Sequence, residues 1–194
     1  ETSLSKRFGL SRSPRREALI RLAAEGLGIN EQNRGAIVAP FDLSHLPKLF
    51  DALCLMQRMT SRLAAQFRTE ADLALIRQLK EKHLRALADK DMINMVDCNR
   101  DFHAAIGQAS KNPYFASLYS RLLDEACRIT RFHAFTYNDE LPETSTQEHE
   151  DLIRAIADQD PDRADAIGKQ HTIELWNSFI RYMSAHTLFD ADIS

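Results

Sequence analysis

The sequence lacks an apolar run near the roughly 18 to 20 residues that a transmembrane helix requires. Its opening turns basic within a few residues and lacks the apolar core of a secretory signal. Cysteine is scarce, because Cys54, Cys98 and Cys127 are odd in number, widely spaced and form no Cys-x-x-Cys pair. These features exclude a disulfide framework and a zinc ribbon as the basis of the fold. We therefore expect a cytoplasmic protein with reduced thiols.

Glycine and proline are also scarce, especially beyond residue 42, where helical periodicity dominates to the end of the chain. Thr69 is a predicted helix N-cap, and Asp160-Pro161 is a predicted break followed by a new helix. A polar loop is expected over 137–145. The pattern predicts six amphipathic helices that pack as an all-α antiparallel bundle, over about 44–67, 69–89, 92–109, 113–132, 146–157 and 161–185.

The net charge is only −3, but it is distributed unevenly. Residues 1–41 carry seven Lys and Arg side chains against four Asp and Glu, a balance of +3, so the other 153 residues carry −6. A small basic head on an acidic body indicates a polyanion-binding module attached to a module of another kind. We expect two domains, residues 1–41 and residues 42–194.

The head has the layout of a helix-turn-helix. Leu4 and Phe8 are expected to anchor a first helix, Gly9 permits a left-handed turn, and Ser11 is expected to cap a second helix. That second helix carries arginines, which can donate to guanine edges in the major groove. Residues 28–39 then contain turn residues and a β-prone run, which makes a small hairpin plausible. The alternative is an exposed basic helix with no nucleic-acid target.

The run FGLSRSPRREALIRLAAEGL resembles the winged-helix signature of the GntR family, and Asn33-Arg34-Gly35-Ala36 resembles its wing tip. The resemblance implies DNA contacts by Ser11, Arg12 and Arg16 of the recognition helix and by Arg34 and Gly35 of the wing. Arg15 is added on its charge alone, since the family usually has an apolar residue there. The family's domain begins with a further helix and a Pro-Gly turn that have no counterpart here, so we expect a head that is truncated at its N-terminus.

Three histidines in the body lie on three different predicted helices. Asn99 and His103 are four residues apart on one helix face, while His149 and His171 lie on the last two helices. Side chains from facing helices can converge in a bundle core, and three imidazoles with one oxygen donor form a common shell for a first-row metal. Each histidine taken singly is more often a surface or core residue than a metal ligand.

The runs NRDFHAAIGQASKNPYF and EHEDLIRAIADQDPDRA, with the His171 that follows, resemble the FCD ligand-binding domain of FadR-type GntR regulators. The resemblance implies a divalent metal, zinc or nickel by preference, at Asn99, His103, His149 and His171. This chain has Asn99 where the family has an aspartate ligand. A neutral donor implies either a lower metal affinity or a bound effector whose carboxylate supplies the missing negative charge. At two positions where the family commonly has an arginine and a glutamate, this chain has Leu53 and Gln57. The class of effector therefore stays open.

We therefore expect a mainly α transcriptional regulator, a homodimer that binds a palindromic operator and responds to a small organic acid through its carboxylate. The alternative is a metal-dependent hydrolase or lyase that uses the same histidines, with Glu148 or Glu150 as a general base. A basic helix-turn-helix would have no purpose in such an enzyme. A third interpretation is a purely structural metal, or no metal at all.

Overall fold

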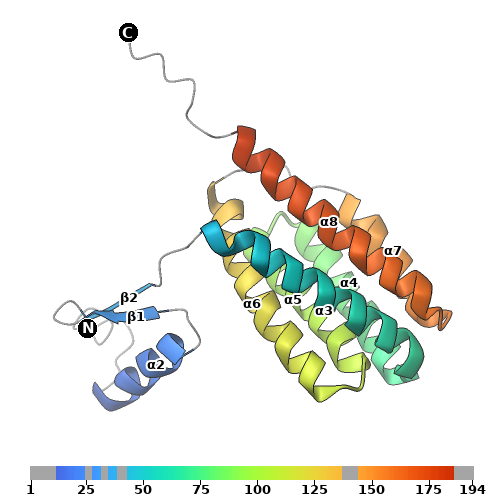
Figure 1. Cartoon of the computed structure of the whole chain (residues 1–194), viewed down its shortest axis with the longest axis horizontal. Helices are drawn as coiled ribbons and strands as arrows, with labels where there is room; N and C mark the ends of the chain where they lie inside the picture. Colours follow the sequence, from blue (N-terminus) through green and yellow to red (C-terminus); the bar gives the residue numbers. More distant parts are fainter. Residues whose placement is uncertain (1–11, 25–27, 32–34, 39–42, 137–143, 186–194) are drawn as a thin grey trace, which may run out of the picture. The chain divides into compact units, whose positions relative to one another are not determined.

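The computed structural model describes residues 12–24, 28–31, 35–38, 43–136 and 144–185 (Figure 1). The chain forms two compact units, one reaching to His45 and the other beginning at Leu46. Among the described residues, no helix is long and apolar enough to cross a membrane.

The first unit contains one described α-helix and a β-hairpin. Helix α2 spans Arg12–Ala24, and strands β1 (Gly28–Glu31) and β2 (Gly35–Val38) pair antiparallel with Gly28 opposite Val38. A short 3₁₀ helix, η1, follows at Leu43–His45. The hairpin predicted over 28–39 is thus confirmed, and α2 coincides with the predicted recognition helix. The predicted helix around Leu4 and Phe8 lies outside the described residues.

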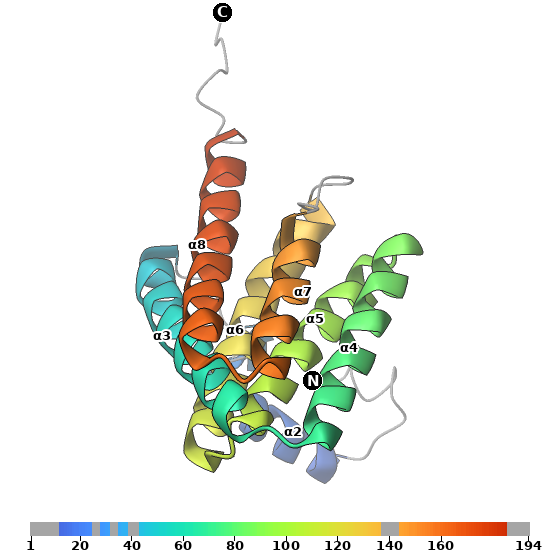
Figure 2. The ribbon, with the colours of Figure 1, turned by 90° about the vertical axis from the view of Figure 1, so that its right-hand side faces the viewer.

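The second unit is a bundle of helices whose mutual packing is seen in Figures 1 and 2. Helix α3 packs against α5, α6, α7 and α8, α4 packs against α5 and α7, and α5 packs against α6. The predicted bundle is confirmed; α6 runs four residues further than expected and α7 begins two residues earlier. The helices are α3 (Leu46–Phe67), α4 (Glu70–Ala88), α5 (Met92–Ala109), α6 (Pro113–Thr136), α7 (Thr144–Ala157) and α8 (Pro161–Ala185).

Local hydrogen bonds fix where these helices begin and end. Thr69 caps α4 as predicted, because its hydroxyl accepts from the backbone N–H of Asp72 while the Asp72 carboxylate accepts from the backbone N–H of Thr69. Arg68 satisfies two carbonyls at the end of α7, donating to Ile156 O at 3.3 Å and to Ala157 O at 2.7 Å. These bonds tie the α3–α4 turn to the α7 terminus.

Three apolar clusters build the described part of the bundle, and two of them are the larger. The largest cluster draws on α3, α4, α5, α7 and α8 and includes Phe102, Ile106 and Leu152, all fully buried. A second cluster joins α3 to α6 through buried side chains: Phe50, Leu53, Tyr119, Leu123 and Ala126.

Candidate metal and effector site

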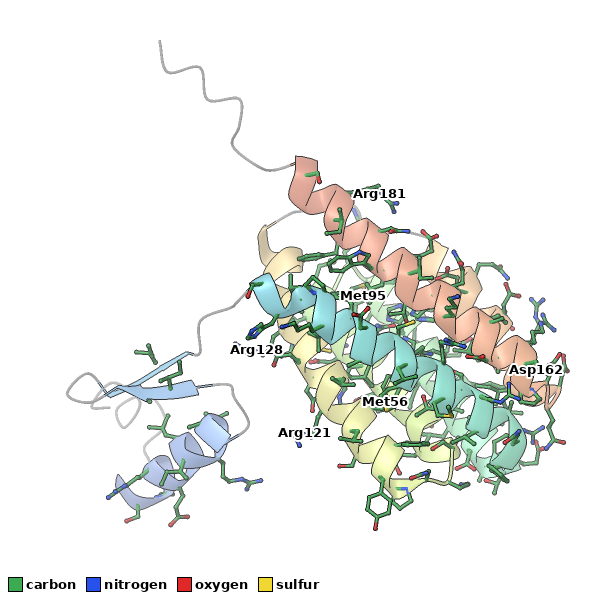
Figure 3. All side chains as sticks on the ribbon, in the orientation of Figure 1. Met56, Met95, Arg121, Arg128, Asp162 and Arg181 are labelled. Carbon is green, nitrogen blue, oxygen red and sulfur yellow. The ribbon has the colours of Figure 1, made fainter. Side chains whose placement is uncertain are left out.

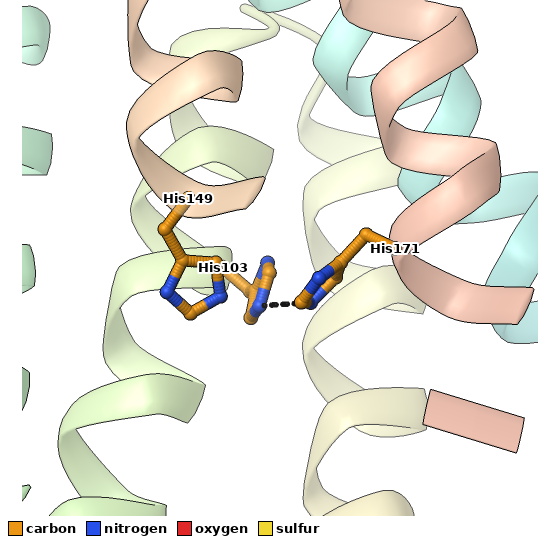
Figure 4. Close-up of side chains that lie close together, drawn as sticks. All are labelled: His103, His149 and His171. Atoms are coloured by element: carbon orange, nitrogen blue, oxygen red, sulfur yellow. Dashed lines mark hydrogen bonds between the residues drawn. The ribbon is translucent and has the colours of Figure 1, made fainter. Parts of the chain in front are cut away.

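Three buried histidines from three helices meet inside the bundle (Figure 4). His103 comes from α5, His149 from α7 and His171 from α8, and one ring nitrogen of each lies within 4.8 Å of the other two. Their ring centroids are 4.9 to 5.1 Å apart. The structure therefore brings together the histidines that the sequence analysis singled out.

The spacing of two of these rings suits a shared metal ion. The Nε2 atoms of His103 and His171 are 3.2 Å apart. Zinc–nitrogen bonds of 2.0 to 2.1 Å in a tetrahedral shell place two ligand nitrogens about 3.3 Å apart. The same separation also allows a hydrogen bond in which one ring N–H donates to the other nitrogen, so this distance fits a metal site but does not require one.

The ring nitrogens of His149 favour a metal ion more strongly than this distance does. Its side chain is buried, and neither ring nitrogen has a hydrogen-bond partner among the described residues. His103 Nδ1 is likewise without a partner there. Leaving a buried polar atom unpaired costs about 1 to 3 kcal/mol. A metal ion in contact with His149 would remove part of that cost.

Burial also sets the protonation state of these rings. It lowers the pKa of His103 and of His149 well below the usual 6.5, and the neighbouring imidazoles lower both further. Neutral imidazoles keep a free lone pair at neutral pH, which is the form that binds metal.

Glu148 orients the third histidine. His171 Nδ1 lies 2.8 Å from Glu148 Oε2, so the ring N–H donates to the carboxylate and the lone pair falls on Nε2, on the side of His103. A carboxylate behind a metal-binding histidine is a recurrent arrangement, which fixes the tautomer and raises ligand basicity. The sequence analysis considered Glu148 only as a general base, and its contact depends on how α7 packs on α8.

His83 is a fourth buried histidine that the sequence analysis did not select. Its Nδ1–H donates to Met95 O at 3.1 Å, and its ring centroid lies 5.6 Å from that of His149. Burial lowers its pKa. A single histidine on the apolar face of α4 looks like any core histidine in a sequence, so no pattern could have selected it.

A cavity lies beside the histidine cluster, and the half-buried Asn99 lines it one helical turn before His103. The cavity has a volume of about 160 Å³, close to that of an engineered cavity that holds benzene. The histidines His83, His103 and His171 line it together with apolar side chains of α3, α5, α6 and α8. A small ligand could therefore lie against both kinds of side chain.

The predicted DNA-contacting residues are only partly described. Arg16 is exposed on α2. Arg12 begins this helix and Arg15 follows in it, but their side chains lie outside the described set, while Gly35 begins β2. Ser11 and Arg34 lie outside the described residues.

Comparison with known proteins places this architecture in a family. The FCD domain family matches residues 48–174. The HTH-type transcriptional repressor GlaR of Escherichia coli K12 is 30% identical over 177 residues, covering 88% of this chain and 80% of GlaR. This chain is an FCD-domain transcriptional regulator of the GntR family.

A second relative and a solved structure are also similar to this chain. The HTH-type transcriptional regulator LutR of Bacillus subtilis is 29% identical over 187 residues, covering 87% of this chain and 84% of LutR. The solved structure of E. coli McbR/YncC shares the fold, with a TM-score of 0.80 at 22% identity over 94% of this chain and 86% of that protein. Because the family consists of regulators, the hydrolase or lyase alternative is set aside.

Proposed function

We propose that this GntR regulator binds operator DNA through its N-terminal unit, and that a divalent metal ion and a small organic acid held in the bundle modulate that binding. The observation that carries the proposal is the convergence of His103, His149 and His171, of which His103 and His171 line one cavity. Zinc and nickel suit an imidazole donor set. The bound ion would supply a positive charge that attracts the carboxylate of the effector.

The chain's own residues define what such an ion would meet. Three neutral imidazoles contribute no charge, and Asn99 would add a neutral amide oxygen as a fourth, weaker donor. Glu148 offsets part of the positive charge through His171. Such a site keeps an excess of positive charge, which favours an anionic ligand over a neutral one.

The DNA-binding half of the proposal rests on family membership and on α2. Relatives such as GlaR are named as repressors. We propose that the protein acts in the cytoplasm as a homodimer whose two heads read the halves of a palindromic operator. The residues proposed to contact DNA are Ser11, Arg12, Arg15 and Arg16 of the recognition helix, with Arg34 and Gly35 of the wing.

Calorimetric titration of chelator-stripped protein with zinc, and separately with nickel, tests the metal site. We expect one ion per chain for the wild type and loss of binding in His149→Ala. His45→Ala removes an exposed histidine outside the cluster and should bind as the wild type does. Asn99→Asp should bind more tightly, because an anionic oxygen replaces a neutral one. If neither the wild type nor Asn99→Asp takes up either ion, the metal proposal is wrong.

A further inference from the structure

The cavity beside the histidines has two chemically different walls. One wall carries the polar groups of α4, α5 and α8: His83, Asn99, His103 and His171. The other is formed by the α3–α6 cluster, in which Phe50, Leu53 and Leu123 are buried, and it is extended by Phe179 of α8, whose ring centroid is 6.3 Å from that of Phe50. A ligand bound at the histidines would therefore extend over hydrocarbon.

The polar groups that border the apolar wall already have partners. The Gln57 amide donates to Ser61 Oγ at 3.2 Å, and its oxygen accepts from the Tyr119 hydroxyl. Arg100 donates to Asp124 Oδ1 at 2.8 Å and to Ser120 Oγ at 2.7 Å. These bonds use the Tyr119 hydroxyl proton and one of the two amide N–H donors of Gln57, and they hold the Arg100 guanidinium on the α5–α6 side.

Among the residues described, two arginines line the cavity, Arg100 and Arg181, but the apolar side chains Phe50, Leu53 and Leu123 bring no cation of their own, and Arg100 is already paired with Asp124 and Asp101. Arg181 contributes to the cavity lining but is exposed on α8 (Figure 3). The acidic lining residues Glu148 and Glu174 would repel a further carboxylate. Burying a charge without a partner is strongly unfavourable.

We propose that the effector is a monocarboxylate with an apolar body, whose carboxylate binds at the histidine wall and whose hydrocarbon part packs on Phe50, Leu53 and Leu123. This inference rests on the proposed metal and effector site and narrows its ligand class. The cavity volume of about 160 Å³ accommodates a body of about the size of a benzene ring or a short alkyl chain. Leu53 is the specificity-determining residue, because a cation at that position would accept a second carboxylate.

Hexanoate and adipate form a matched pair of probes, since both have six carbons and differ in a second terminal carboxylate. In calorimetric titrations of zinc-loaded protein, hexanoate should bind at least tenfold more tightly than adipate. From propanoate to hexanoate, each added methylene should lower Kd about fourfold until the cavity is full. Equal affinity for the two probes would overturn the inference, as would a series that does not tighten with chain length.

Substitution at Leu53 tests where the discrimination arises. Leu53→Arg should weaken hexanoate binding and shift the hexanoate-to-adipate ratio at least tenfold toward adipate. Leu55→Arg, an exposed position on the same helix outside the cavity lining, should leave the ratio unchanged. An unchanged hexanoate-to-adipate ratio in a folded Leu53→Arg protein counts against the inference. If that variant does not fold, the ratio measured for the wild type decides between the two outcomes.

The two levels of the proposal fail in different ways. If zinc binds but neither hexanoate nor adipate does, the monocarboxylate class is wrong and the metal site stands. If zinc and nickel do not bind at all, the proposed metal function fails before any effector is considered.

Discussion

At the scale of single residues, the negative charge beside the histidine cluster comes from Glu148 and not from the residue four positions before His103. Asn99 stands where the family pattern has an aspartate, so the side chain four residues before His103 is neutral. The carboxylate of Glu148 lies 2.8 Å from His171 Nδ1, on the far side of that ring from His103. Glu148 can therefore supply negative charge through an imidazole, where an aspartate would supply it directly.

Removing this carboxylate should weaken metal binding. Glu148→Ala leaves His171 without its hydrogen-bond acceptor and removes one negative charge, so the zinc affinity should fall about 10- to 100-fold. Glu148→Gln keeps an acceptor oxygen without the charge and should give an intermediate affinity. Competition with a chromophoric chelator measures both changes.

Asp151→Ala is the matched control, because Asp151 lies three residues along α7 from Glu148 and its carboxylate pairs with the exposed Arg154. It should bind zinc within about twofold of the wild type, an order-of-magnitude limit for a surface ion pair. A Glu148→Ala protein that binds zinc as tightly as Asp151→Ala would show that Glu148 does not position His171.

The residues of the site were accessible to sequence reasoning to different degrees. His103 and His149 could be selected because each lies in a run that resembles a known domain, and His171 because it follows the second run. Helical spacing placed Asn99 beside His103. His83 and the Glu148 contact could not be selected. Both depend on which helices pack together, because Met95 on α5 accepts from His83 on α4, and His171 on α8 donates to Glu148 on α7.

At the scale of elements, helices α3 and α8 approach closely beside Gly168. A Cβ at this position would lie 3.2 Å from Ser61 Oγ and 3.3 Å from the backbone carbonyl oxygen of Gln57. Gln57 in turn accepts from the Tyr119 hydroxyl on α6. Gly168 thus allows α8 to pack against the part of α3 that borders the cavity.

A larger side chain at this crossing should destabilise the bundle. Gly168→Val should lower the free energy of unfolding by about 1 to 3 kcal/mol, because the side chain has to displace backbone or buried polar atoms. Ala166→Val places the same β-branched side chain at an exposed position of α8. It should change the free energy of unfolding by less than about 0.5 kcal/mol. Urea unfolding followed by circular dichroism measures both. Equal stability of the two variants would mean that the helices separate at little cost.

The helices themselves could be predicted closely, since their signals are local. Periodicity, the Thr69 cap and the Asp160-Pro161 break are all encoded within a few residues. The α6 terminus was placed at Phe132, yet the helix runs to Thr136, because no glycine or proline ends it there. The contact at Gly168 joins residues about 110 positions apart in sequence, and no local pattern reports it.

At the scale of the whole molecule, one helix connects the proposed ligand to the DNA-binding head along the chain. Helix α3 begins at Leu46, where the second compact unit begins, and it carries Phe50 and Leu53 within its first two turns. An effector packed on these side chains would contact the segment that directly follows the head. Ligand binding can change DNA affinity only by favouring one of two states of the protein. The first two turns of α3 are the part of the bundle best placed to change conformation between these two states.

The buried histidines also make the stability of the metal-free protein depend on pH. Burial lowers the pKa of His83, His103 and His149. Below about pH 6.5 the unfolded chain binds protons at these histidines and the folded chain does not. The free energy of unfolding should therefore fall as the pH drops from 7.5 to 5.5, by up to about 1.4 kcal/mol per pH unit for each histidine. Urea unfolding of chelator-stripped protein measures this slope in a range where the lowered pKa values of Asp72 and Asp165 keep both ionised. His149→Leu should flatten the slope. A wild-type protein equally stable at pH 5.5 and 7.5 would contradict the burial of neutral imidazoles.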